Sequence, residues 1–284
     1  MNEKDSSLLL ALSYLDFLKT SEKLMLMACF DSVDALASSN IEELSRLVNR
    51  RLRTKFDLKS LITLVKQGQV ALKFYNIKIL TMQDIPLQLR EIPDPPFTLF
   101  VRGTLPEENF NMIAMVGTRY PTGEALRLAF QLGKECASLA VPVVSGLARG
   151  IDCYAQRGCV EAKGATVGVL ACGVDRVYPL SNARLAQKII GTGGCLLSEY
   201  PPFTEPMKFR FPQRNRIISG LSRSVIVVEA PKKSGALITA DFALEQGRDV
   251  FVCKDVLESK KNEGSRVLFE DGAHPIQSIK EILD

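Results

Sequence analysis

The chain has 284 residues, which suits one large domain or two modest ones. Hydrophobic residues make up 46% and charged residues 24%, a balance that excludes disorder, collagen and coiled coil as the main theme. The net charge of +4 is too small to indicate a nucleic-acid partner by itself. No apolar run approaches the roughly 20 residues that span a bilayer, and the first five residues contain acids, unlike a signal peptide. We therefore expect a soluble cytoplasmic protein without a membrane partner.

The first 75 residues show helical spacing of apolar side chains and no convincing strand. Leucines recur in this way between residues 8 and 18, and a second apolar-periodic stretch covers 56–72. Asn40 followed by Glu43 suits a helix start. We predict four or five short helices and a helical N-terminal domain over residues 1–75.

Residues 76–111 are predicted to form a linker with lead-in strands. Strands are expected at 77–80 and 98–103, and the proline-rich stretch 92–96 between them cannot be helical.

From residue 112 to residue 253, short apolar strands alternate with helices. Strands are predicted at 113–116, 141–145, 165–170, 195–198, 225–228 and 250–253, and helices at 121–139, 151–162, 182–190, 212–220 and 236–246. Strands that are apolar throughout are typical of a parallel sheet that helices cover on both faces. We predict an α/β fold with a mostly parallel sheet over 112–284.

The cysteines and the single histidine exclude several kinds of site. Seven cysteines are present without C-x-x-C spacing, and several lie in apolar strings, as buried reduced thiols would. His274 lies far from any nucleophile-like motif, so we expect neither a zinc site nor a His-dependent catalytic triad. No cofactor, metal site or catalytic residue is predicted.

Glycine-rich corners follow most of the predicted strands. They lie at 117–119, 145–152, 172–175 and 234–235. In an open parallel sheet, ligands bind at the carboxyl ends of strands, where glycines let backbone N–H groups approach an anion. Arg119 and Arg149 could each bind a phosphate there. The alternative is that these turns simply need glycine. Neither a dinucleotide fingerprint nor a P-loop is present.

A basic segment with interleaved phenylalanines covers residues 205–233. Its cations, Lys208, Arg210, Arg214, Arg216, Arg223, Lys232 and Lys233, face only Glu205 and Glu229. Phe203, Phe209 and Phe211 could stack on bases while the cations neutralise phosphates, as single-stranded nucleic acid requires. The alternative is a solvated basic loop whose phenylalanines lie in the core.

Together these strings resemble the DNA-processing protein A family (DprA, also called Smf), over residues 85–253. The matching strings are MVGTR (115–119), SGLARGID (145–152), GVD (173–175), SEYPP (198–202), FPQRNRIISGL (211–221), VEA (228–230) and SGALITA (234–240), with Tyr178, Pro179, Asn182 and the lead-in 94–103.

The resemblance implies an extended Rossmann-like domain, after a SAM-like helical domain, that binds single-stranded DNA. It also implies a non-enzymatic, homodimeric recombination mediator that protects incoming strands and loads the RecA recombinase during natural transformation. By the same resemblance Arg119, Ser145, Gly146, Arg149 and Arg184 contact DNA. Arg214 and Arg216 either bind DNA or brace loops through Asp152 or Glu229. The predicted DNA- and phosphate-binding residues are Gly117, Thr118, Arg119, Ser145, Gly146, Arg149, Gly150, Gly173, Asn182, Arg184, Arg214, Asn215, Arg216, Ser234 and Gly235.

Three departures from the family pattern and two rival functions remain. The usual Pro-Gly after the last strand is Lys254-Asp255 here, the stretch 18–22 lacks the glycine of a DNA-binding helical hairpin, and no C-terminal winged helix is expected. One rival is a nucleotide-processing enzyme of the phosphoribohydrolase kind, but no glutamate follows Ser234–Ala240 at the spacing that such enzymes show. The other is a nucleotide-sensing or protein-interaction module.

Overall fold

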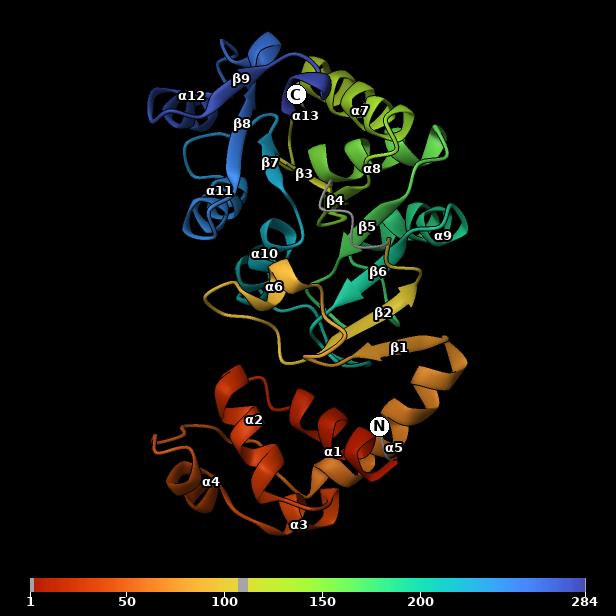
Figure 1. The fold of residues 1–284 in the computed structure, drawn as a ribbon, viewed down its shortest axis with the longest axis vertical. Helices are drawn as coiled ribbons and strands as arrows, with labels where there is room; N and C mark the ends of the chain where they lie inside the picture. Colours follow the sequence, from red (N-terminus) through yellow and green to blue (C-terminus); the bar gives the residue numbers. More distant parts are fainter. Residues whose placement is uncertain (1–2, 107–111, 284) are drawn as a thin grey trace.

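A computed structural model describes residues 3–106 and 112–283. Helices near the N-terminus lie below a long twisted sheet that runs up through the rest of the molecule (Figure 1). The predicted boundary at residue 111 falls outside the described residues, as do the two ends of the predicted domains, residues 1–2 and 284.

Five helices occupy the described residues up to 74. They are α1 (Glu3–Ser13), α2 (Thr20–Cys29), α3 (Val33–Ser38), α4 (Ile41–Leu47) and α5 (Ser60–Phe74). The Asn40 side chain accepts the N–H of Glu43 at 2.8 Å, and Ser32 accepts that of Ala35 at 3.1 Å, so side chains cap the starts of α4 and α3. The leucines of α1 are buried, as their spacing predicted.

The sheet holds nine strands among the described residues, in the order β1-β2-β6-β5-β4-β3-β7-β8-β9. They are β1 (Ile77–Leu80), β2 (Leu99–Gly103), β3 (Ile113–Val116), β4 (Val143–Ser145), β5 (Thr166–Val169), β6 (Cys195–Ser198), β7 (Ser224–Val227), β8 (Asp249–Cys253) and β9 (His274–Ile276). The β1–β2 and β2–β6 pairs are antiparallel, and the other pairs are parallel. The predicted mostly parallel sheet is confirmed.

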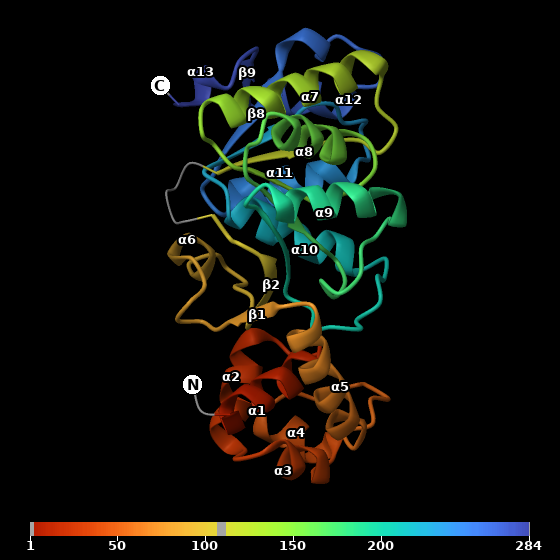
Figure 2. The same cartoon turned by 90° about the vertical axis from the view of Figure 1, so that its right-hand side faces the viewer.

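Helices cover both faces of the sheet, as Figure 2 shows for α7, α8 and α9 in front of it. One face packs against α7 (Gly123–Ser138), α8 (Ile151–Glu161), α9 (Ala183–Gly191) and α13 (Lys280–Leu283), and the other against α6 (Leu87–Arg90), α10 (Arg210–Gly220), α11 (Gly235–Glu245) and α12 (Glu263–Glu270). On β3, Ile113 and Met115 join the first face, while Ala114 and Val116 join the second. This strict alternation with both faces buried explains the continuous apolar strands in the sequence.

The N-terminal helices pack directly on the edge of the sheet. Ser13 and Thr98 share a hydrogen bond of 2.9 Å, and the Thr20 hydroxyl donates to the Pro95 carbonyl at 2.6 Å. The apolar core of these helices continues into Phe97 and Phe100. The division of the chain at residues 75 and 111 stays a prediction, since β1 and β2 belong to the same sheet as the later strands.

Some elements differ from the predicted ones. Helix α10 begins at Arg210, so Pro212 is its third residue rather than its first; its missing N–H still falls in the first turn, where no helical partner exists. Strand β9 and helices α6, α12 and α13 were not predicted, because they are short and partly polar. The loop after β8, which departs from the family pattern, forms a 3₁₀ turn, Lys254–Val256. The buried Asn262 donates to the Val256 carbonyl at 3.0 Å and accepts the Ala230 N–H at 2.8 Å, so it fixes this loop to the residue after Glu229.

Six cysteines are buried and Cys29 is exposed, and all seven have free thiols. Among residues 3–106 and 112–283, no helix combines the length and apolar character that crossing a bilayer requires.

Candidate nucleic-acid interface

The carboxyl ends of β3 and β7 open onto a cavity of about 620 Å³. Helices α10 and α11 and the segment 117–120 supply most of its lining. Seven of the predicted residues meet there: Gly117, Thr118, Arg119, Arg214, Asn215, Ser234 and Gly235. Glycine-rich corners from distant parts of the sequence therefore converge at one edge of the sheet, as the strand order requires.

In the first glycine-rich corner, residues 117–119, contacts with neighbouring elements fix the backbone, and the Arg119 side chain is exposed. A Cβ at Gly117 would lie 2.5 Å from a side-chain carbon of Ile151, so the close packing of α8 requires glycine there. The Thr118 N–H donates to the Glu229 carbonyl at 2.7 Å, and the Ile151 N–H donates to the Thr118 carbonyl at 3.3 Å. Arg119 is exposed directly after these bonds, with its guanidinium 5.3 Å from the centre of the Phe211 ring.

In the second glycine-rich corner, residues 145–152, the polar groups form hydrogen bonds within the protein itself. Ser145 is fully buried and its hydroxyl donates to the Met115 carbonyl at 2.6 Å. The Gly146 N–H donates to the Asp152 carboxylate at 3.1 Å. The buried Asn182 amide donates to the Leu147 carbonyl at 2.9 Å. The expectation that these three residues hold a phosphate does not agree with this geometry, because each donor already has a partner inside the protein.

Arg214 lies under the floor of the cavity rather than on its rim. Its side chain is buried, and its guanidinium donates to the Gly146 carbonyl at 2.9 Å and to the Val169 carbonyl. Burial lowers the pKa of Arg214 to about 10, while the nearby Asp152 opposes the shift. Burial also raises the pKa of Asp152, against the effect of Arg214. Arg214 therefore stays charged at neutral pH and ties β5 to the second corner.

Arg216 points away from the cavity and braces a different part of the molecule. It forms a two-bond ion pair with Glu199, at 2.8 and 2.7 Å, and its Nε donates to Asp94 at 2.9 Å. The bracing alternative fits this geometry, but with Glu199 and Asp94 as partners instead of Asp152 and Glu229. The neighbouring Asn215 does line the cavity, and its amide donates to the Gly235 carbonyl at 3.2 Å.

Aromatic rings and cations lie side by side at the cavity. The rings of Tyr178 and Phe211 are 5.6 Å apart and tilted by 56°, and Arg119 lies over the second ring. Lys208 and Lys233 line the same cavity and are exposed. Among the described lining residues, Asp152 is the one acid. The cavity is therefore suited to an anion that carries flat rings.

The phenylalanines of the basic segment are not core residues. Phe203 and Phe209 are 43% and 48% exposed, and Phe211 is half-buried at the cavity. This excludes the alternative in which the three rings fill the core.

The remaining predicted residues lie elsewhere. Arg149 and Arg184 are exposed but do not line the cavity, and Gly173 packs against the backbone of Pro201. Gly150 has φ of +82° at the start of α8, where a Cβ would lie 2.3 Å from the Thr118 carbonyl oxygen. Gly150 therefore shapes the first corner instead of contacting the cavity.

The prediction omitted several lining residues, among them Tyr120, Tyr178, Lys208, Lys233 and Thr239. The local excess of positive charge over 205–233 had already singled out the two lysines. Tyr178 was named only among the family-matching residues, and Tyr120 carried no signal, because an aromatic residue in a loop looks the same whether it is buried or exposed. Over the part of the chain that the structure describes, no cluster of His, Cys, Asp and Glu could hold a metal ion.

Comparison with known proteins agrees with this architecture. A family model described as DNA recombination-mediator protein A matches residues 76–284. The chain belongs to this family. The matched region contains all nine described strands and the residues that line the cavity, and it begins just after the N-terminal helices.

Curated relatives carry the names DprA and Smf. The chain is 43% identical to the DNA processing protein DprA of Bacillus subtilis, covering 72% of this chain and 69% of the relative. It is 40% identical to DprA of Streptococcus pneumoniae, with 70% of each chain covered. It is 41% identical to the Smf protein of Synechocystis, but spans only 51% of that protein.

Two solved structures resemble this fold, one over nearly the whole chain and the other over about three quarters of it. The X-ray structure of DNA processing protein A from Streptococcus pneumoniae superposes with a TM-score of 0.75 at 30% identity, covering 96% of this chain and 95% of that one. A structure of the Helicobacter pylori protein superposes with a TM-score of 0.66 at 30% identity, covering 73% and 94%. Its description concerns a single-stranded DNA binding mode of that protein.

Proposed function

We propose that this protein binds single-stranded DNA at the cavity on the carboxyl edge of its sheet. The observation that carries this proposal is the exposed Arg119 guanidinium, which lies 5.3 Å from the Phe211 ring beside a cavity with one acidic lining residue. A charge-assisted contact from Arg119 would hold a phosphate, while Phe211 and Tyr178 offer ring faces to bases. The structural relative from Helicobacter pylori, described as binding single-stranded DNA, supports the same ligand.

We propose fewer DNA-binding residues than the sequence predicted, because only some of them line the cavity. Arg119 is the proposed phosphate contact, with Thr118, Asn215, Ser234 and Gly235 around it. Arg149 and Arg184 stay proposals as outer contacts of a longer strand, because both are exposed.

The cellular role that we propose is that of a recombination mediator. In this role the cytoplasmic protein, as a homodimer, protects single strands that enter during natural transformation and loads RecA onto them. Membership in the recombination-mediator family supports this role. Light scattering of the purified protein would test the homodimer, and nuclease protection of a bound strand, with RecA assembly on it, would test the mediator activity.

The proposal includes no catalytic step. Asp152, which lines the cavity, and Glu229, which lies just after β7, are both engaged with the scaffold: Asp152 accepts the Gly146 N–H at 3.1 Å, and Glu229 accepts the Thr122 N–H and hydroxyl at 3.0 and 2.6 Å. Neither points freely at a ligand as a general acid or nucleophile would. Neither carboxylate therefore supports the phosphoribohydrolase alternative.

A titration of labelled oligothymidylate against duplex of equal length tests the proposal. We expect the single strand to bind more tightly, without regard to sequence, since ring faces and phosphates supply the contacts. A nucleoside monophosphate should compete weakly and should not be hydrolysed. Equal affinity for blunt duplex, or release of ribose phosphate from the mononucleotide, would contradict the proposal.

A further inference from the structure

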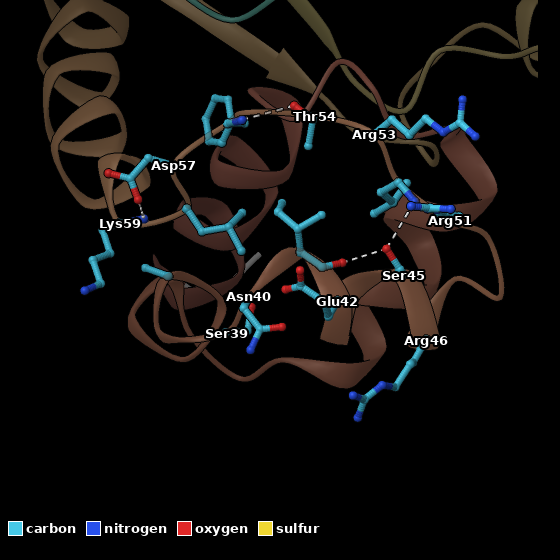
Figure 3. Close-up of a pocket in the computed structure, with 15 residues that line it drawn as sticks. Ser39, Asn40, Glu42, Ser45, Arg46, Arg51, Arg53, Thr54, Asp57 and Lys59 are labelled. Carbon is cyan, nitrogen blue, oxygen red and sulfur yellow. Dashed lines mark hydrogen bonds between the residues drawn. The ribbon is translucent and has the colours of Figure 1, made fainter.

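A second hollow, of about 820 Å³, lies within the N-terminal helices, away from the carboxyl edge of the sheet. It is formed by the turn before α4, by α4 itself and by the segment 51–59 that leads into α5. Figure 3 shows the side chains of Arg53, Arg51 and Arg46 following one another along one side of this hollow, with Lys59 on the opposite side.

The cations of this hollow lack partners within the part of the chain that the structure describes. Arg46, Arg51, Arg53 and Lys59 are exposed, and no ion pair or side-chain hydrogen bond joins them to the described residues. The adjacent Arg50 differs, because it forms two hydrogen bonds to Glu22, at 2.7 and 2.8 Å. The row of arginines is thus open to an external anion.

The charge around the hollow is positive overall. Its four cations outnumber the lining acids Glu42 and Asp57, and the Asp57 carboxylate already accepts the backbone N–H of Lys59 at 3.1 Å. A row of cations is often only a solvated face of a helix. Here three of the four come from α4 and an irregular loop and line a concave surface, which suits a bound polyanion better than a solvated helix face.

A chain of contacts connects this hollow to the carboxyl edge of the sheet. Arg50, beside the row, also donates to the Phe17 carbonyl at 3.1 Å. The next residue toward the N-terminus, Asp16, forms an ion pair of 2.6 Å with Arg210. Arg210 is flanked in sequence by Phe209 and Phe211, and the latter lines the first cavity. The two basic surfaces therefore lie on either side of one junction, formed by the α1–α2 turn and the start of α10.

We propose that the row Arg46, Arg51 and Arg53 binds phosphates of the same DNA single strand after it leaves the carboxyl-edge cavity. This inference rests on the proposed function, because it extends that strand along the molecule. The first cavity offers rings and cations together. Phe56, the aromatic residue that lines the hollow in the N-terminal helices, instead packs against Phe17 in the core of these helices, with 6.1 Å between the ring centres, so the hollow presents mainly cations and polar groups. The second surface therefore binds backbone without reading bases.

The test uses the full chain with Arg51→Ala and Arg53→Ala combined. Two oligothymidylates, of about six and about thirty nucleotides, bracket the ~4–16 nucleotides that a single-strand-binding module covers. We expect the double variant to bind the long strand roughly fivefold to tenfold more weakly, and to lower its salt slope by about 1.4, since each lost single-strand phosphate contact contributes ~0.7. The short strand should bind as it does to the unchanged protein.

Lys260→Ala with Lys261→Ala is the matched control, because these exposed lysines lie after β8, toward the opposite end of the sheet. If both double variants bind the long strand alike, the proposal is overturned. It is also overturned if the Arg51 and Arg53 variant loses duplex affinity while it keeps the long strand. Loss of both oligonucleotides on Arg119→Ala, with the N-terminal variant behaving as the control, would leave the proposed function standing and remove only this extension.

Discussion

Burial separates two arginines that look alike in the sequence. Arg119 follows the glycine-containing turn after β3, and Arg214 lies in the basic segment 205–233. Both residues line the same cavity. Arg119 is exposed and contacts a ring, whereas Arg214 is 4% exposed and donates to two backbone carbonyls. We therefore propose that Arg119 binds the ligand and that Arg214 supports the floor of the cavity.

Arg214→Ala should lower the free energy of unfolding by about 2–4 kcal/mol, because it leaves two buried carbonyls without donors and creates a void. Urea unfolding followed by circular dichroism measures this change. Arg119→Ala is the comparison and should alter stability by less than about 0.5 kcal/mol, as for an exposed side chain. The reverse order of the two variants would contradict the assignment.

Gly150→Ala should destabilise the protein by about 1–3 kcal/mol, because alanine rarely adopts φ of +82° and its Cβ would meet the Thr118 carbonyl oxygen. Thermal unfolding provides the measurement. Gly123→Ala is the matched control, since α7 begins there and a Cβ would have no heavy atom within 4 Å. A Gly150 variant as stable as the Gly123 variant would show that the first corner tolerates a side chain.

At the scale of helices and strands, apolar periodicity predicted most of the fold. Apart from Asp249 at the start of β8, the residues of strands β3 to β8 are buried, so each strand consists mainly of apolar residues that the sequence displays directly. The same reasoning fails for β9, whose first two residues, His274 and Pro275, are exposed at the edge of the sheet. It also fails for α6, whose four residues are too few to show a period.

The candidate site was harder to predict than the fold. The sequence indicates which corners reach the carboxyl edge, because the carboxyl ends of parallel strands lie at the same edge of the sheet. It does not show which polar groups at a corner bond to the scaffold: Ser145, Gly146 and Asn182 all do. Arg216 has an acidic partner 122 positions away in the chain, Asp94, which no local pattern reveals.

The pairing of Glu22 with Arg50 makes the N-terminal helices sensitive to acid. The hydrogen bonds from Arg50 lower the pKa of Glu22 below its ordinary value, against the effect of burial. A lowered carboxyl pKa means that the pair stabilises the fold fully above the unfolded pKa of about 4.3, and that this contribution fades as pH falls through the lower folded value.

Glu22→Gln should therefore lower the free energy of unfolding at pH 7 by up to about 1 kcal/mol, the scale of a partly exposed ion pair. Glutamine keeps the acceptor for the Lys19 N–H at the start of α2, so the variant isolates the charge. Urea unfolding at neutral pH and at a pH well below 4 compares the two proteins. A difference that stays constant with pH would rule out the ion pair as its cause.

For the whole molecule, the placement of charge matters more than its sum. The net charge of +4 is small, yet exposed cations gather at the carboxyl-edge cavity and around the N-terminal hollow. Both surfaces flank the junction where the Asp16–Arg210 ion pair joins the N-terminal helices to α10. The fold thus sets two basic surfaces along one path, although the composition alone indicates no anionic partner.

The most direct test of the central claim is the affinity of Arg119→Ala for labelled oligothymidylate, measured at several salt concentrations. We predict a loss of about 1–3 kcal/mol, the range of a charge-assisted contact, and a salt slope reduced by ~0.7 for one phosphate. Arg119→Lys should recover only part of the affinity, because a point charge lacks the bidentate fork. Arg127→Ala, an exposed arginine of α7 outside the cavity, should bind as the unchanged protein does. Unchanged affinity and salt slope for Arg119→Ala would contradict the account.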